Sequence, residues 1–362
     1  MQTQNQKVSL DSPSLLGHEG LLWRKVGMGQ KILVTGGAGY IGSHTIVDLI
    51  ENGYEVVSID SFLNATPSVF EGIKNITGQK IKNYDVDLCD YKKLKKVFKK
   101  HKIQGIIHFA ALKSVGESVE MPLEYYENNI LGLTNILKAA KKYGVKNFIF
   151  SSSCSVYGNP KKLPVTEKTP LQEAESPYAF TKVIGERIVK DFIAANEGFK
   201  AVLLRYFNPA GAHSSNEIGE SSPKMLNLVP VITAVGAGKK DQLTVFGNDY
   251  DTRDGSCVRD YIHVCDLAHA HTLALQKSIE NTLEKIETIN LGSGDGVTVL
   301  EAINAFEKVS SQKLNYQIEG RRAGDVVAVY ADNKKAQKIL GWNPKYTIED
   351  IMKTAWTWEN KI

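Results

Sequence analysis

Cysteine is scarce in this sequence, and long apolar runs and net charge are lacking. The chain has 362 residues but only four cysteines, with no CxxC pair and no spacing that suits a disulfide framework or a zinc site. We therefore expect a reducing, cytoplasmic environment and no metal centre. No run of about 20 apolar residues occurs, so neither a membrane span nor a membrane partner is expected. The net charge of +4 is too small to indicate a nucleic-acid partner.

The remaining composition is that of an ordinary globular protein, with 42% apolar and 23% charged residues. At roughly 150 residues per domain, the length suggests two domains. Residues 1–29 are polar and mixed in character and lack the apolar stretch of a secretory signal. We predict that they form a flexible N-terminal extension.

Short apolar runs alternate with helical patterns from Lys31 onward. Strands are predicted at 31–35, 55–59, 105–109, 147–150 and 201–206, and helices at 91–101, 122–143 and 178–197. This alternation is typical of βαβ units, so we predict an α/β fold with a Rossmann-type, doubly wound parallel sheet over residues 30–207. Loops lengthen after Asn208, which predicts a smaller mixed α/β domain over 208–362. A late strand at 288–292 could return to the main sheet.

A glycine-rich turn lies between the first predicted strand and the first helix. Gly36, Gly39 and Gly42 have the spacing of a dinucleotide-binding turn, in which backbone approaches a pyrophosphate at a helix N-terminus. Asp60 ends the next strand, where a carboxylate accepts hydrogen bonds from a ribose diol and repels a 2′-phosphate. This pattern favours NAD over NADP. Three glycines in a purely structural turn are the alternative.

Tyr178 and Lys182 lie four residues apart in "SPYAFTK" (176–182), so a helix places them on one face. A phenol has a pKa of about 10, and we expect a nearby ammonium group to lower it. Tyr178 is then a candidate general acid or base near neutral pH. The spacing is common by chance, and a surface pair would also explain it.

Serines follow a predicted strand in "FSSSCSVYG" (150–158), at the carboxyl end where open α/β sheets bind ligands. Ser153 is predicted to hydrogen-bond the reacting oxygen and to pass a proton to Tyr178. A polar loop without a catalytic role is the alternative.

Further motifs occur along most of the chain: "HFAALKSVGESV" (108–119), "YYENNI" (125–130), "LRYFNPAGAH" (204–213), "FGNDY" (246–250), "VRDYIHV" (258–264) and "RRAGD" (321–325). With the features above, the chain resembles the extended short-chain dehydrogenase/reductase family from about Lys31 to Trp358, and in particular its nucleotide-sugar 4-epimerases. The resemblance implies an isomerase that interconverts UDP-galactose and UDP-glucose through a transient 4-keto sugar. It also implies tightly bound NAD, a UDP-sugar as the substrate and a homodimer.

The resemblance also implies roles for individual residues. Ser153, Tyr178 and Lys182 match the catalytic set. The residues implied to contact NAD are Gly36, Gly39, Tyr40, Ile41, Gly42, Asp60, Ser61, Phe62, Asn64, Ala65, Asp87, Leu88, Phe109, Ala110, Ala111, Lys113, Asn128, Ser153, Tyr178, Lys182 and Phe207. Those implied to contact the substrate are Lys113, Ser153, Tyr178, Asn208, Asn227, Leu228, Thr244, Val245, Phe246, Arg259, Arg322, Asp325 and Val329.

Val329 occupies a position that carries a bulky tyrosine in bacterial members restricted to unacetylated sugars. Whether N-acetylated UDP-sugars are accepted therefore stays open. A nucleotide-sugar dehydratase is disfavoured because Cys154 and Ser155 replace the Asp-Glu pair that such relatives carry. Another nucleotide-sugar epimerase or a decarboxylase remains an alternative. A non-catalytic dinucleotide sensor would not need the tyrosine, lysine and serine together.

Overall fold

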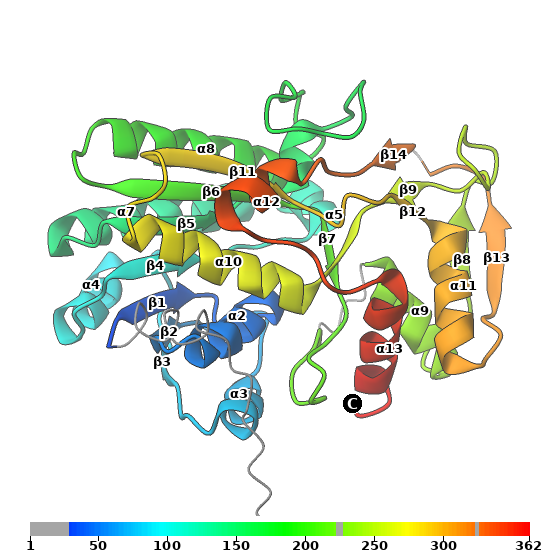
Figure 1. The fold of residues 1–362 in the computed structure, drawn as a ribbon, viewed down its shortest axis with the longest axis horizontal. Coiled ribbons are helices and arrows are strands. Elements are labelled where there is room, and N and C mark those ends of the chain that lie inside the picture. Colours follow the sequence, from blue (N-terminus) through cyan, green and yellow to red (C-terminus); the bar gives the residue numbers. More distant parts are fainter. Residues whose placement is uncertain (1–28, 222–226, 323–325) are drawn as a thin grey trace, which may run out of the picture.

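A seven-stranded parallel sheet forms the centre of the larger part of the molecule (Figure 1). The computed structural model describes residues 29–221, 227–322 and 326–362, so the predicted extension lies, but for Gly29, outside the described residues. The strands are β1 (Lys31–Thr35), β2 (Glu55–Ile59), β3 (Lys82–Tyr84), β4 (Gly105–His108), β5 (Asn147–Ser151), β6 (Lys200–Tyr206) and β11 (Ile286–Leu291). Their order is β11-β6-β5-β4-β1-β2-β3, which is the doubly wound arrangement that was predicted.

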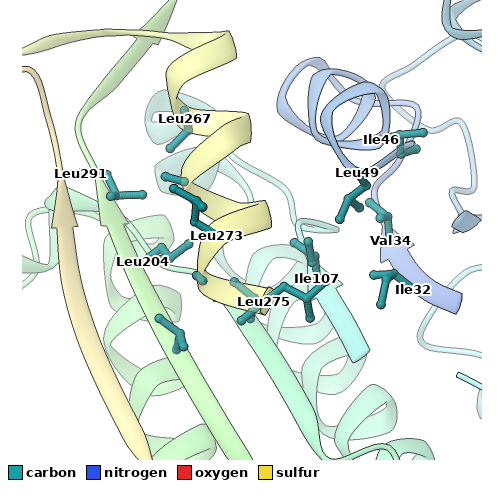
Figure 2. Packing of buried hydrophobic residues seen from close by; sticks show 14 of the residues in the cluster. Ile32, Val34, Ile46, Leu49, Ile107, Leu204, Leu267, Leu273, Leu275 and Leu291 are labelled. Carbon is teal, nitrogen blue, oxygen red and sulfur yellow. The ribbon is translucent and has the colours of Figure 1, made fainter. Parts of the chain in front are cut away.

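Alternating side chains of these strands fill two apolar layers, because successive residues of a strand point to opposite faces. Ile32 and Val34 pack on one face with α2 (Tyr40–Glu51) and α10 (Val264–Ile279), as Figure 2 shows. Leu33 packs on the other face. The helices of that face are α4 (Tyr91–Lys100), α7 (Gly132–Tyr143) and α8 (Pro177–Ala194). Both faces are therefore covered, which explains the near-continuous apolar strands.

A smaller α/β part gathers at one end of the molecule around its own apolar core (Figure 1). Its helices are α9 (Leu228–Gly236), α11 (Val299–Ser310) and α13 (Ile348–Glu359). Its strands pair as β8 (Leu243–Phe246) with β13 (Tyr316–Glu319), β7 (Asn208–Ala210) with β10 (Tyr261–His263), and β9 (Val258–Arg259) with β12 (Val297–Thr298) on one side and β14 (Ala328–Val329) on the other.

The late part of the chain does not stay within the smaller α/β part. β11 pairs in parallel with β6, so the segment predicted at 288–292 does return to the main sheet. α10 packs on the sheet beside α2, and α12 (Lys334–Leu340) packs against the same layer.

The helix predicted at 122–143 differs in detail, because a π-helical turn, η1 (Glu127–Leu131), separates α6 (Pro122–Tyr126) from α7. Among the elements that were not anticipated are α3 (Val69–Thr77), β3 and α5 (Val115–Glu120). In the part of the chain that the structure describes, no helix is both long and apolar enough to cross a membrane.

Candidate active site

The glycine turn lies where the strand order reverses, between β1 and β4. Gly36 has a φ of 72°, and a Cβ there would lie 2.8 Å from the backbone nitrogen of Ala110, which follows β4. A Cβ on Gly42 would overlap the carbonyl oxygen of Gly36. The two strand ends therefore approach each other so closely that only glycine fits, and a crevice at this switch point is where open α/β sheets bind ligands.

The turn fits the pyrophosphate of a dinucleotide. Gly39 is the N-cap of α2, and among the described residues no side chain caps this helix end. The first N–H groups of a helix have no intrahelical acceptor, so those of Tyr40, Ile41 and Gly42 can bind phosphate oxygens with the help of the helix dipole.

Asp60 follows β2 and faces this turn. Its carboxylate accepts hydrogen bonds from the backbone N–H groups of Ala38 and Phe62, both at 2.9 Å. Burial raises the pKa of Asp60, and the two backbone hydrogen bonds oppose that shift. A carboxylate has about four acceptor sites, so Asp60 can orient the turn and still accept from a ribose hydroxyl.

The other residues predicted to contact NAD spread around the same crevice, and those roles stay predictions. Ser61, Asn64, Asp87 and Lys113 are exposed, and Leu88 is buried. The half-buried ones are Phe62, Ala65, Phe109, Ala110, Ala111 and Asn128. Tyr40, which is also among the predicted NAD residues, contacts another part of the chain. Its hydroxyl donates to the Gly211 carbonyl at 2.6 Å and so connects the glycine turn to the loop after β7.

Tyr178 and Lys182 share one face of α8, as predicted. Ser176 caps this helix by accepting from the Ala179 N–H, and Pro177 occupies its first turn. The Lys182 Nζ lies 5.8 Å from the centre of the Tyr178 ring and donates to the Ser151 carbonyl at 2.8 Å. The buried ammonium group is therefore anchored to the end of β5, beside the predicted serine.

Ser153 lies two residues beyond the end of β5 and begins the short helix η2 (Cys154–Tyr157). Its side chain is largely buried and accepts from the Ser155 N–H at 3.2 Å. The Ser153 side chain also lies close enough to Tyr178 to lower the pKa of its phenol. The three predicted catalytic residues are thus brought together from two elements.

The expectation that Lys182 lowers the Tyr178 pKa is wrong for the protein by itself. Burial raises the pKa of Tyr178 well above its ordinary value, with a further increase from Tyr206, and the nearby Ser153 side chain only partly opposes this. Burial also lowers the pKa of Lys182 to about 8. With that pKa, Lys182 remains mostly charged at neutral pH, but the burial of the phenol outweighs the effect of this charge.

The predicted sugar-side residues lie on short strands of the smaller part. Arg259 on β9 is in register with Val329 on β14, and its Nη1 donates to the carbonyls of Val258 and Val326 at 2.9 and 2.7 Å. Asn208 follows the buried Phe207 and is half-buried. These positions lie between the end of the main sheet and the smaller α/β part.

The remaining sugar-side predictions lie at the outer end of the site. The Arg322 guanidinium lies 5.3 Å from the centre of the Phe246 ring on β8. Thr244 on the same strand is half-buried, whereas Val245 packs into the apolar core of the smaller α/β part. Asp325 lies outside the described residues.

Glu220 joins two of the predicted residues and was not identified from the sequence. Its Oε1 lies 3.4 Å from both the Lys113 Nζ and the Asn227 Nδ2. Asn227 is exposed and precedes α9, in which Leu228 is the first residue.

Asp260 is a second residue that sequence reasoning missed. It is fully buried, and its carboxylate accepts from the N–H and hydroxyl of Ser293, both at 2.7 Å, and from the Ala331 N–H at 3.0 Å. The Asp260 carbonyl accepts from the Asn208 N–H at 3.0 Å. Its place in "VRDYIHV", directly after Arg259, was the one available signal.

Comparisons with known proteins agree with this geometry. A family model described as GDP-mannose 4,6 dehydratase matches residues 33–355. The UDP-glucose 4-epimerase of Bacillus subtilis (strain 168) is 47% identical over 330 residues, which is 91% of this chain and 96% of that protein. The UDP-glucose 4-epimerase of Homo sapiens is 45% identical over 341 residues, 92% of this chain and 97% of that protein.

Solved structures are similar over the same range. UDP-glucose 4-epimerase from Bifidobacterium longum in complex with NAD⁺ and UDP has a TM-score of 0.86 and 44% identity, and the match covers 92% of this chain and 98% of that one. The enzyme from Stenotrophomonas maltophila with bound NAD and formylated UDP-arabinopyranose has a TM-score of 0.89 and 42% identity, with the same coverage.

Proposed function

Because the chain belongs to the UDP-glucose 4-epimerases of the extended short-chain dehydrogenase/reductase family, we infer that it is an isomerase that interconverts UDP-galactose and UDP-glucose with tightly bound NAD. One observation carries this inference: Ser153, Tyr178 and Lys182 come together at the carboxyl end of β5, at the same edge of the parallel sheet as the glycine turn after β1. Cys154 and Ser155 supply no carboxylic acid, so elimination of water, as in a dehydratase, has no acid at that position.

We propose that the protein's own groups handle the proton and the positioning. NAD⁺, when bound, supplies hydride transfer to and from C4 of the sugar and a positive charge that favours a nearby phenolate. Tyr178 takes the proton of the sugar 4′-hydroxyl and returns it, and Ser153 hydrogen-bonds the same oxygen. Lys182 holds the end of β5 and contributes charge next to the Tyr178 ring.

The reaction needs a firmly held nucleotide and a loosely held hexose, because the sugar must present both faces. Arginine forks pair well with diphosphate oxygens, which assigns this role to Arg259 and Arg322. We infer that Phe246 and Thr244 on β8 border the uracil. The hexose then lies between Asn208 and Val329, with Tyr178 on one side.

The direct test is to incubate the purified chain with UDP-galactose, without added NAD⁺, and to follow UDP-glucose by chromatography. We expect interconversion by the wild type and a loss of about 10³-fold in kcat for Tyr178→Phe, since general acid–base catalysis is removed. The variant should retain its NAD, which serves as the control for folding. A wild type that holds NAD but does not convert UDP-galactose would contradict the proposal.

We propose that the small side chain of Val329 admits N-acetylated UDP-sugars as well. Val329 stands in register with Arg259, so a larger residue there would crowd the sugar-side end of the site. A similar structure, at 38% identity and a TM-score of 0.81, is that of the UDP-Glc/GlcNAc 4-epimerase from Campylobacter jejuni. Val329→Tyr should lose activity on UDP-N-acetylglucosamine while retaining activity on UDP-glucose, and equal effects on both sugars would oppose this role.

We also propose that the chain forms a homodimer through α5, α6 and α8. Large apolar side chains are exposed on these helices: Val115, Val119, Leu123 and Phe180. A contiguous exposed apolar patch is typical of an interaction surface. Light scattering should give a dimer mass for the wild type and a monomer for Leu123→Asp, with Ile362→Asp as an exposed apolar control that stays dimeric. A wild-type monomer would refute the assignment.

We propose a cytoplasmic location, as the scarcity of cysteine suggested. The thiols of Cys89, Cys154, Cys257 and Cys265 are all free, which suits a reducing compartment. Cell fractionation with an antibody to the chain would test this.

A further inference from the structure

A buried ion pair lies directly behind the catalytic residues. Glu186 follows Lys182 by one turn of α8, and Arg205 comes from the adjacent strand β6. The Arg205 Nε and Nη2 donate to the two Glu186 carboxylate oxygens at 2.7 and 2.6 Å, with both side chains almost fully buried. Burial alone would raise the Glu186 pKa, but the Arg205 hydrogen bonds bring it below its ordinary value, so the carboxylate is charged at neutral pH.

The ion pair is hydrogen-bonded to residues on both sides of Ser153 in the sequence. On the side before it, the Ser152 hydroxyl donates to the Glu186 Oε1 at 2.6 Å. On the side after it, the Arg205 Nη1 donates to the Tyr157 hydroxyl at 3.0 Å, and Tyr157 in turn donates to the Asn290 Oδ1 at 2.6 Å. The main chain that carries Ser153 is therefore fixed at Ser152 and at Tyr157 by one pair of charges.

A third anchor comes from the catalytic lysine, whose Nζ donates to the carbonyl of Ser151. Lys182 and Glu186 thus bind consecutive residues, Ser151 and Ser152, from successive turns of the helix that also carries Tyr178. Movement of α8 relative to β5 would break both hydrogen bonds together. This double attachment fixes the segment that leads into Ser153 relative to the helix that carries Tyr178.

We propose that Glu186 and Arg205 are positioning residues that hold the Ser153 hydroxyl against Tyr178, a role that rests on the proposed epimerase function. Both side chains act through the segment 151–157, to which they are hydrogen-bonded at Ser152 and Tyr157. A buried ion pair is weak evidence of stability, because apolar residues often replace such pairs without loss. Here the Arg205 Nε and Nη2 groups both donate to Glu186. The other hydrogen bonds of the pair go to Ser152 and Tyr157 on the serine segment and to Lys190, whose Nζ lies 3.3 Å from the Glu186 Oε2.

The test is a double-mutant cycle on kcat, because a general loss of stability would not depend on Ser153. Ser152→Ala removes one hydroxyl and leaves the ion pair in place. We expect it to lower kcat about tenfold with an unchanged KM, since displacing a catalytic group by a fraction of an ångström is costly. In a Ser153→Ala background the same substitution should have almost no further effect.

Controls separate positioning from folding and from the proposed activity itself. Tyr157→Phe tests the second anchor in the same cycle, and Arg187→Gln breaks an exposed ion pair on the same helix and should not change kcat. NAD content and Tm are measured for every variant. Multiplicative effects of Ser152→Ala and Ser153→Ala, or a Ser152→Ala kcat equal to that of the wild type, would overturn the proposal. An inactive wild type would instead refute the proposed function.

Discussion

The two halves of the proposed site, one for the cofactor and one for the sugar, are held in shape by different parts of the chain. The cofactor half depends on main-chain shape: Gly36 and Gly42 allow the end of β1, the start of α2 and the segment after β4 to come together. The sugar half depends on side chains, and Asp260 holds Ser293 and Ala331 by hydrogen bonds from one buried carboxylate.

The residues that shape the cofactor half are close together in the sequence, whereas those that shape the sugar half are far apart. The glycine turn is specified within seven consecutive residues, because each glycine removes a local steric conflict. Asp260 acts on partners that lie 33 and 71 positions further along the chain. A main-chain site is therefore visible in sequence, whereas a site held by side chains from distant segments becomes visible only in the fold.

The sharpest way to break this comparison is to add one methyl group to the turn. Gly42→Ala would place a Cβ in the space of the Gly36 carbonyl, so the turn cannot form as it stands. We expect nearly complete loss of bound NAD, read from the absorbance of the denatured extract. Gly116→Ala is the matched control, because nothing lies within 4 Å of a Cβ there. Normal NAD content in Gly42→Ala would contradict the steric argument.

A smaller effect is expected in the sugar half. Asp260→Asn keeps the shape but replaces one acceptor by an amide donor, which then faces N–H groups. We expect a free energy of unfolding lower by about 2 kcal/mol. KM for UDP-galactose should rise about tenfold as Arg259 shifts, with NAD content unchanged. The exposed Asp295→Asn serves as the control, and a loss of NAD in Asp260→Asn would show that the two halves are not independent.

Lowering the pH should destabilise the two halves to different extents, with a smaller effect than either substitution. Burial lowers the pKa of His44 and His108 to about 3, and that of His263 and His271 to about 4. Each ring takes up a proton on unfolding between its folded pKa and about 6.5, so the unfolded state binds more protons and stability falls as the pH decreases through that range.

We expect Tm to be about 5 °C lower at pH 5 than at pH 7. Three of these rings, His44, His108 and His271, pack on or within the main sheet layer. Hydrogen exchange, corrected for its intrinsic rate, should therefore increase more in β1 and β4 than in α11 and α13. An equal increase in both regions would show that the protein unfolds as one unit under acid.

Much of the fold could be predicted from sequence, because apolar strands and amphipathic helices have distinct periods. The strands at 31–35 and 55–59 were placed to the residue. The π-helical turn at 127–131 was not, since its local pattern is helical and only packing reveals the extra residue.

The candidate site shows the same division. The spacing of Tyr178 and Lys182 revealed their shared face, but the raised pKa of Tyr178 depends on burial beneath distant segments, which spacing does not report. Glu186 continues the same spacing by one turn, yet its partner Arg205 lies on another element. An ion pair between residues of two different elements can be identified only once the fold is known.

The return of β11 to the edge of the main sheet bears on how such an enzyme can be recombined. The residues proposed to hold the nucleotide-sugar lie on two excursions, one between β6 and β11 and one between β11 and α12. A chimera with a relative of different sugar preference therefore needs paired crossovers on both sides of each excursion. A single junction after residue 207 would import a foreign edge strand and a foreign α10 into the cofactor half.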